Sequence, residues 1–229
     1  MCTVTYLPLG GNDFILTSNR DEDPNRKTIP PRTYEEDKVY LTYPKDAFAG
    51  GTWIGVSGRN RLICLLNGGF ENHVRVIPYK KSRGLIVKEL LKVGNAIEEI
   101  ELFDFKGVEP FTIILVDWNE KLKAYELVWD GSSKYFSELD NTPRIWSSST
   151  LYTKKMKEMR KVWFSDWLRG RRVFKREDIL KFHQDETRGK KEVALKMKRA
   201  TVETVSITCV MKKEGDVSFD YFDNAVSSI

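Results

Sequence analysis

The sequence has few of the residues that build disulfide frameworks and metal sites. Its 229 residues include three cysteines, Cys2, Cys64 and Cys209, an odd number at wide spacings, which argues against a disulfide-stapled secreted domain. The two histidines, His73 and His183, lie far apart in the sequence and match no metal-ligand spacing. We therefore expect a protein of the reducing cytoplasm that uses no metal ion and no other cofactor.

Long hydrophobic runs and phosphate-binding loops are also absent. No apolar stretch approaches the roughly 20 residues of a membrane-spanning helix, and the first residues lack the basic flank and apolar stretch of a secretory signal. The stretch GGTWIG lacks the Lys-Ser/Thr pair of a P-loop. We expect neither a membrane span nor nucleotide-binding chemistry.

Charge of one sign is only slightly in excess. The net charge is +5, and the densest basic stretches are KKMKEMRK, RGRRVFKR and RGKKEVALKMKR. We interpret them as solvated helix faces of mixed charge, with nucleic-acid binding as the alternative, and expect no nucleic-acid partner. Abundant Lys and Glu with few Gln are typical of a thermophile. A homo-oligomer is left open.

The sequence does contain many short strand patterns and two blocks of helical periodicity. The chain is long enough to bury a substantial core, and we predict one domain over residues 1–229. Strands are predicted at residues 3–7, 14–18, 39–43, 52–57, 62–66, 111–116, 123–129, 144–148, 204–210 and 217–222, and helices within 82–94, 95–103, 151–170 and 175–185. This order favours an α+β fold, with largely antiparallel sheets covered by helices.

The second residue is a candidate nucleophile. Removal of Met1 would leave Cys2 as a first residue with both a thiol and a free α-amine. The ordinary pKa of a cysteine thiol is about 8.5 and that of an α-amino group is about 7.7–8.0. Part of the amine is therefore uncharged at neutral pH and can accept the thiol proton. The alternative is a buried cysteine without a catalytic role.

A polar motif is predicted to lie beside this residue. If Gly10-Gly11 is a two-residue turn, Cys2 lies opposite Asn19 in a hairpin. The motif Asn19-Arg20-Asp21-Glu22 then adjoins the N-terminus, and we expect Arg20 to favour the thiolate and Asp21 to orient the amine. A slip of one residue would exchange which side chains share the thiol's face. The alternative is a polar turn after a strand.

A third stretch could stabilise a developing oxyanion. The apolar run LICLLNGGF ends in Asn67-Gly68-Gly69, so a buried strand would deliver an amide side chain and glycine N–H groups at its end. Donors of this kind contribute roughly 3–4 kcal/mol each to transition-state stabilisation. An ordinary Asn-Gly turn is the alternative.

Taken in order, these stretches resemble the NRDE family, also called Transport and Golgi organisation protein 2-like. The resemblance rests on the initial Met-Cys, SNRDED, GGTWIGVS, LLNGG and KSRGLIVKEL, which cover about the first 90 residues. It implies an N-terminal nucleophile (Ntn) hydrolase fold, a four-layer αββα sandwich of two antiparallel sheets between helix layers. It also implies that Cys2 is the nucleophile, that Arg20 and Asp21 are its neighbours, and that Asn67 is the oxyanion donor.

The resemblance has two departures. Ser149 stands where related hydrolases usually have Asn, and Glu203 stands near an expected Arg, with Arg199 close by but out of register. If both losses are real, the substrate differs or hydrolysis is weakened. The residues expected to bind substrate are Asn19, Glu22, Trp53, Gly68 and Ser149.

The resulting hypothesis is an amidohydrolase that cleaves a linear or cyclic non-peptide amide through a thioester on Cys2. Its partner would be a small-molecule amide or acyl substrate. The alternative is a non-catalytic carrier or trafficking protein of the same fold that binds an acyl chain or a haem-like ligand.

Overall fold

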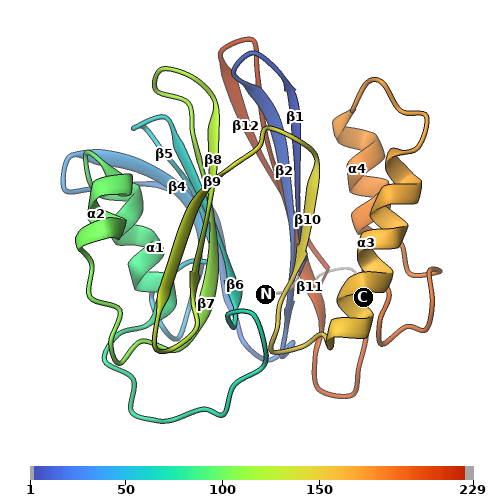
Figure 1. Ribbon diagram of the computed structural model, residues 1–229, viewed down its shortest axis with the longest axis horizontal. Helices are drawn as coiled ribbons and strands as arrows, with labels where there is room; N and C mark the ends of the chain where they lie inside the picture. Colours follow the sequence, from blue (N-terminus) through green and yellow to red (C-terminus); the bar gives the residue numbers. More distant parts are fainter. Residues whose placement is uncertain (1–2, 225–229) are drawn as a thin grey trace. The chain divides into compact units, whose positions relative to one another are not determined.

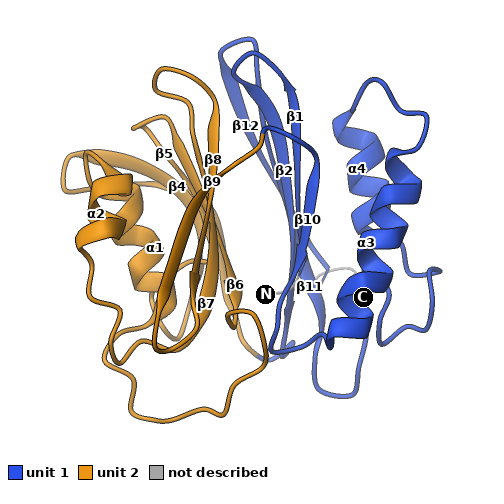
Figure 2. Ribbon diagram, viewed as in Figure 1, with its two compact units in different colours: residues 1–25, 141–229 blue, residues 26–140 orange. Residues whose placement is uncertain are grey.

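The computed structural model describes residues 3–224, so Cys2 lies outside the described residues. The chain divides into two compact units (Figure 2). The first unit takes the chain up to Asn25 and again from Asn141 onward, and the second takes Arg26–Asp140. Within the described residues there are twelve strands and four helices, and all strands that pair in the two sheets are antiparallel. The predicted α+β class is confirmed.

The first unit is a five-stranded sheet with two helices along one face (Figure 1). The sheet order is β10-β1-β2-β11-β12, formed by β10 (Arg144–Ser147), β1 (Thr3–Gly10), β2 (Asp13–Glu22), β11 (Glu203–Lys213) and β12 (Asp216–Asp223). Helices α3 (Lys154–Leu168) and α4 (Arg176–His183) pack on it. The core between helices and sheet includes Leu7, Ile15, Phe164 and Trp167.

The predicted register of the first hairpin is wrong by one residue. Thr3, not Cys2, is the partner of Asn19, and Gly10 pairs with Asp13 after an irregularity between Pro8 and Gly10. The turn is therefore Gly11-Asn12 instead of Gly10-Gly11. A bulge beside a glycine-rich turn takes up the extra residue, and sequence alone does not reveal it.

The second unit is a seven-stranded sheet with two helices. Its order along the sheet follows the sequence: β3 (Thr28–Glu36), β4 (Val39–Asp46), β5 (Ile54–Ser57), β6 (Arg61–Asn67), β7 (Phe111–Asp117), β8 (Lys123–Trp129) and β9 (Lys134–Leu139). In the sequence, α1 (Arg83–Lys92) and α2 (Ala96–Leu102) come between β6 and β7. The central strands β6 and β7 are apolar and buried along almost their whole length.

Two strands were missed by the sequence patterns, and both are sheet edges. β3 runs through Pro30-Pro31, a stretch predicted to be loop, and β9 was not predicted at all. An edge strand leaves one side of its backbone unpaired, so it tolerates proline. Both strands alternate between half-buried and exposed residues and thus carry little apolar signal.

Candidate active site

Asn19 joins β2 to α4 and to the segment before β11. The side chain is fully buried. Its amide nitrogen donates to the carbonyl oxygens of His183 (3.0 Å) and Leu195 (2.8 Å), and its oxygen accepts from Nδ1 of His183 (2.6 Å). Both amide hydrogens are used inside the protein. These contacts hold the strand in place, and substrate binding by Asn19 stays a prediction.

The contacts of His183 define its tautomer. An amide oxygen can only accept, so Nδ1 carries the proton. Nε2 then accepts from the Thr5 hydroxyl at 2.8 Å. Complete burial, with a smaller contribution from the nearby guanidinium of Arg160, lowers the pKa of His183 to about 3. The imidazole is thus neutral at physiological pH and acts as a structural hydrogen-bonding group of α4.

Asp21 has a buried carboxylate held from two sides. The hydroxyl of Tyr152 donates to Oδ2 (2.7 Å), and the hydroxyl of Thr204, at the start of β11, donates to Oδ1 (2.5 Å). Asp21 is only 2% exposed. Hydrogen bonds of this kind fix both the position and the rotamer of a carboxylate. The carboxylate of Asp21, in the Asn19–Glu22 motif, is therefore preorganised.

Arg160 supports this arrangement from α3. Its guanidinium lies 3.7 Å from the ring centre of Tyr152 and donates to the carbonyl oxygens of Val193 and Ala194. It also donates to the hydroxyl of Thr3, the first described residue of β1. One buried cation thus connects the start of β1 with the tyrosine that holds Asp21.

Arg20 lies on the opposite face of β2. Side chains alternate along a strand, so Arg20 shares its face with Ser18, and their partners on β11 are Ser206 and Thr208. These three hydroxyls are buried and have no hydrogen-bond partner among the residues that the structure describes. The Arg20 guanidinium lies 3.9 Å from the carboxylate of Glu22. A cation beside buried, unpaired hydroxyls is suited to polar chemistry on this face.

Ser149 and Glu203, the two residues that depart from the family pattern, each contact a lysine. The hydroxyl of Ser149 accepts from the ammonium of Lys157 (2.5 Å). Glu203 is a strand partner of Glu22 and forms an ion pair with Lys198 (3.1 Å). Positive charge thus lies next to Glu203, although it comes from a lysine and not from the expected arginine. Substrate binding by Glu22 and Ser149 stays a prediction.

The predicted oxyanion residues lie in the second unit, at the end of β6. Asn67 is the partner of Phe111. The N–H of Gly68 donates to the carbonyl of Pro110 (3.0 Å), and the carbonyl of Gly68 accepts from the Thr112 hydroxyl (3.0 Å). The Gly68 N–H therefore has a partner inside the unit, and substrate binding by Gly68 stays a prediction. The role of Asn67 stays a prediction.

Two of the sequence motifs meet for a structural reason. A Cβ on Gly51 of GGTW would lie 2.6 Å from the backbone of Gly84 of SRG. The Thr52 N–H donates to the Gly84 carbonyl. Arg83 of the same motif donates to the Pro110 carbonyl that also binds Gly68. Through these contacts, the GGTW and SRG motifs hold the end of β6 in position. Trp53 is buried, and substrate binding by it stays a prediction.

Sequence reasoning missed Tyr152, Arg160, His183 and Thr204. Arg160 had a signal, because it precedes Phe164 and Trp167 by four and seven residues and so falls on the buried stripe of α3. The others gave none. Tyr152 and Thr204 lie 131 and 183 residues from Asp21 in the sequence.

Within residues 3–224, no group of three or more His, Cys, Asp or Glu side chains is placed to hold a metal ion. None of the helices in this range combines the length and apolar character that crossing a membrane requires.

Comparison with a family model supports the resemblance over nearly the whole chain. The model of Transport and Golgi organisation 2 matches residues 1–218. The chain belongs to this family. No curated protein sequence matches this family member significantly.

Solved structures identify the fold of this family member. A Caenorhabditis elegans orthologue of N-acylethanolamine-hydrolyzing acid amidase matches with a TM-score of 0.62 at 14% identity, over 91% of this chain and 92% of that one. A variant of conjugated bile acid hydrolase from Clostridium perfringens matches with a TM-score of 0.52 at 11% identity, over 98% and 92%. Both are Ntn hydrolases, so the predicted fold is confirmed.

Proposed function

We propose that the protein is an N-terminal-cysteine amidohydrolase. It cleaves a small-molecule amide, linear or cyclic, through a thioester on Cys2 after removal of Met1. The support is the Met-Cys start, the family and fold, and the buried carboxylate of Asp21, which two hydroxyls from distant elements hold rigidly. The last observation carries the proposal, because a buried acid that only filled space would be costly to retain.

The first half-reaction forms the thioester. The thiol of Cys2 gives its proton to the α-amine, which Asp21 orients, and Arg20 favours the thiolate. The sulfur attacks the amide carbon, so a C–S bond forms and the carbonyl oxygen becomes an oxyanion, to which Asn67 donates. The C–N bond then breaks, and the ammonium returns its proton to the leaving nitrogen. The amine half departs.

The second half-reaction releases the acid. The uncharged α-amine takes a proton from water as the oxygen attacks the thioester carbon. When the C–S bond breaks, the ammonium protonates the departing sulfur. Cys2 and its amine are restored for the next cycle.

We also propose that the protein works in the cytoplasm. Cys64 and Cys209 are buried and are not joined in a disulfide, as is usual for thiols in a reducing compartment. Burial raises the pKa of Cys209 to about 11, so its thiol is inert at neutral pH.

Replacing the nucleophile tests the proposal. In Cys2→Ala, hydrolysis of a panel of N-acyl amides is expected to fall by at least about a thousandfold, the scale seen when a nucleophile is removed. Cys209→Ala is the matched control, because it removes a buried free thiol from the first unit and should retain activity. Intact-mass measurement of the untagged protein should show the loss of one methionine. Full activity in Cys2→Ala would refute the mechanism.

A further inference from the structure

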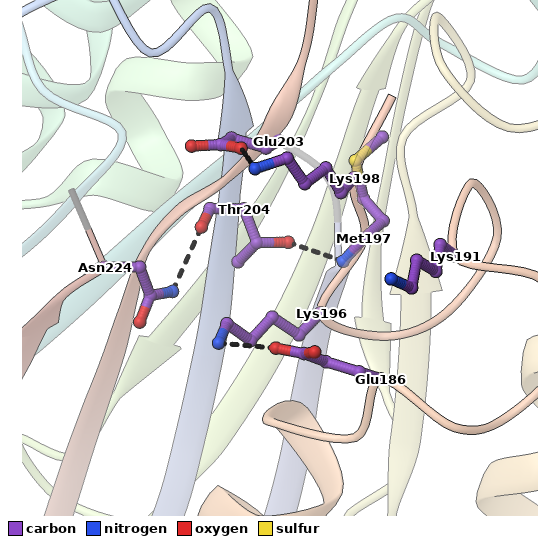
Figure 3. Close-up of a pocket in the computed structure, with 8 residues that line it drawn as sticks. All are labelled: Glu186, Lys191, Lys196, Met197, Lys198, Glu203, Thr204 and Asn224. Atoms are coloured by element: carbon purple, nitrogen blue, oxygen red, sulfur yellow. Dashed lines mark hydrogen bonds and ion pairs between the residues drawn. The ribbon is translucent and has the colours of Figure 1, made fainter. Parts of the chain in front are cut away.

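A small polar cavity of about 280 Å³ lies in the first unit, at the end of the sheet where β11 begins (Figure 3). Its lining comes from the segment before β11, from the start of β11 and from the residue after β12: Glu186, Lys191, Lys196, Met197, Lys198, Glu203, Thr204 and Asn224. Cavities for drug-sized ligands have roughly 300–1,000 Å³. This one is suited to one end of a substrate.

The charges around this cavity are unequal. Three lysines face two glutamates. Lys196 pairs with Glu186 (2.6 Å), and Lys198 pairs with Glu203 (3.1 Å). Lys191 has no ion pair with any residue from 3 to 224, and in Figure 3 its nitrogen points towards the other lining residues. The cavity therefore offers an ammonium group whose charge no carboxylate of residues 3–224 neutralises.

One lining side chain connects the cavity to the candidate active site. The hydroxyl of Thr204 donates to Asp21 and accepts from the N–H of Met197 (2.9 Å). The carbonyl of Thr204 accepts from the amide of Asn224 (3.0 Å). A ligand in the cavity therefore lies one side chain away from the carboxylate that is proposed to orient the α-amine.

We infer that this cavity binds a carboxylate on the amine half of the amide substrate, with Lys191 as its main partner. The inference rests on the proposed function. In that mechanism the α-amine beside Asp21 returns its proton to the leaving nitrogen, so the leaving half of the substrate is the half nearest Asp21. An anionic leaving half, as in an N-acyl amino acid, matches the unneutralised ammonium.

Three amides with an octanoyl-sized acyl half separate the possibilities. N-octanoylglycine has its carboxylate on the amine half, N-octanoylethanolamine is uncharged, and an N-alkyl monoamide of a dicarboxylic acid has its carboxylate on the acyl half. The wild-type protein is expected to prefer the glycine amide. In Lys191→Ala the ratio of kcat/KM for the glycine amide to that for the ethanolamide should fall about twofold to fivefold, the scale of an exposed ion pair.

Lys190→Ala is the matched control. It removes the same charge from the neighbouring position, which does not line the cavity, and should preserve the ratio. High salt should reduce the preference of the wild-type protein for the glycine amide. An equal ratio in wild-type and Lys191→Ala would overturn the inference, while hydrolysis of all three amides would leave the proposed function intact. Preference for the dicarboxylic monoamide would also overturn it.

A binding measurement separates the two proposals. Calorimetry with N-octanoylglycine and the Cys2→Ala variant should show binding that Lys191→Ala weakens and Lys190→Ala does not. If this binding is found but the wild-type protein hydrolyses no amide, carboxylate binding by the cavity is supported and the proposed function is refuted. Binding that is independent of Lys191, or no binding at all, would refute the cavity's role.

Discussion

The two units place polar groups in their interiors in different ways. The second unit builds its centre from the apolar strands β6 and β7. Its buried Arg61 stabilises the C-terminal end of α1, because it donates to the carbonyls of Leu90, Val93 and Gly94. In the first unit, β1 and β2 bury polar side chains along their middle, including Thr5, Thr17 and Asn19.

The difference predicts how each unit responds to a change of conditions or sequence. An unpaired buried polar group costs about 1–3 kcal/mol, and an apolar strand would avoid that cost. The first unit instead retains a connected network from His183 to Asn19 and from Arg160 through Tyr152 to Asp21. We expect the second unit to respond most to changes in close packing, and the first to changes in pH and hydrogen bonding.

Close packing in the second unit gives the largest expected effect. In Gly51→Ala the new Cβ would meet three backbone atoms of Gly84 and Leu85 at 2.6–2.9 Å. Because backbone cannot rotate away as a side chain can, the free energy of unfolding should fall by about 2–3 kcal/mol, towards the upper end for overpacking. Urea unfolding measures this. Gly94→Ala is the control, since its Cβ would meet nothing within 4 Å; equal losses would refute the explanation.

Acid should destabilise the first unit through His183. Its pKa is about 3 in the folded protein against an ordinary 6.5, so between these values the unfolded chain binds the extra proton. Stability is therefore full above pH 6.5 and falls as the pH is lowered. From pH 7.5 to 5 the loss should be about 2 kcal/mol, before most carboxylates titrate. Unfolding in urea at both pH values measures it.

Nuclear magnetic resonance identifies the group responsible. The His183 imidazole should keep the chemical shifts of the neutral Nδ1–H tautomer at pH 5. A protonated His183 in the folded protein at that pH would contradict the prediction, whatever the unfolding curves show.

Removing one hydroxyl should give the smallest change in stability. Tyr152→Phe deletes the hydrogen bond to Asp21 and should cost about 1 kcal/mol of stability. If Asp21 acts as proposed, kcat should fall about tenfold with KM little changed, equivalent to about 1.4 kcal/mol. Tyr6→Phe is the control, because it removes a similar bond, to Asn141 at 2.7 Å, away from the motif. An equal loss of kcat in both variants would argue against a positioning role.

Much of the fold but only part of the candidate site could be predicted from the sequence. Hairpins with apolar cores, such as β7 and β8, were predicted because periodicity reports burial. The edge strands β3 and β9 were missed because they are half exposed. Asp21 was found from its motif, but its partners Tyr152 and Thr204 were not, since only the tertiary fold brings such distant residues together. The turn lies one residue later than predicted, which alone would place Val4 opposite Asn19, and the irregularity between Pro8 and Gly10 places Thr3 there instead.

The pairing of β2 with β11 has a consequence for the order of assembly on the ribosome. The second unit is one continuous segment and can fold as it emerges, whereas the sheet that contains β1 is incomplete until Glu203–Lys213 has been made. Protein synthesis proceeds at about 5–20 residues per second, so the interval between the synthesis of β2 and that of β11 lasts roughly 10–40 s. Throughout it, β2 lacks its partner strand β11, so the sheet of the first unit is completed only after the whole second unit has been made.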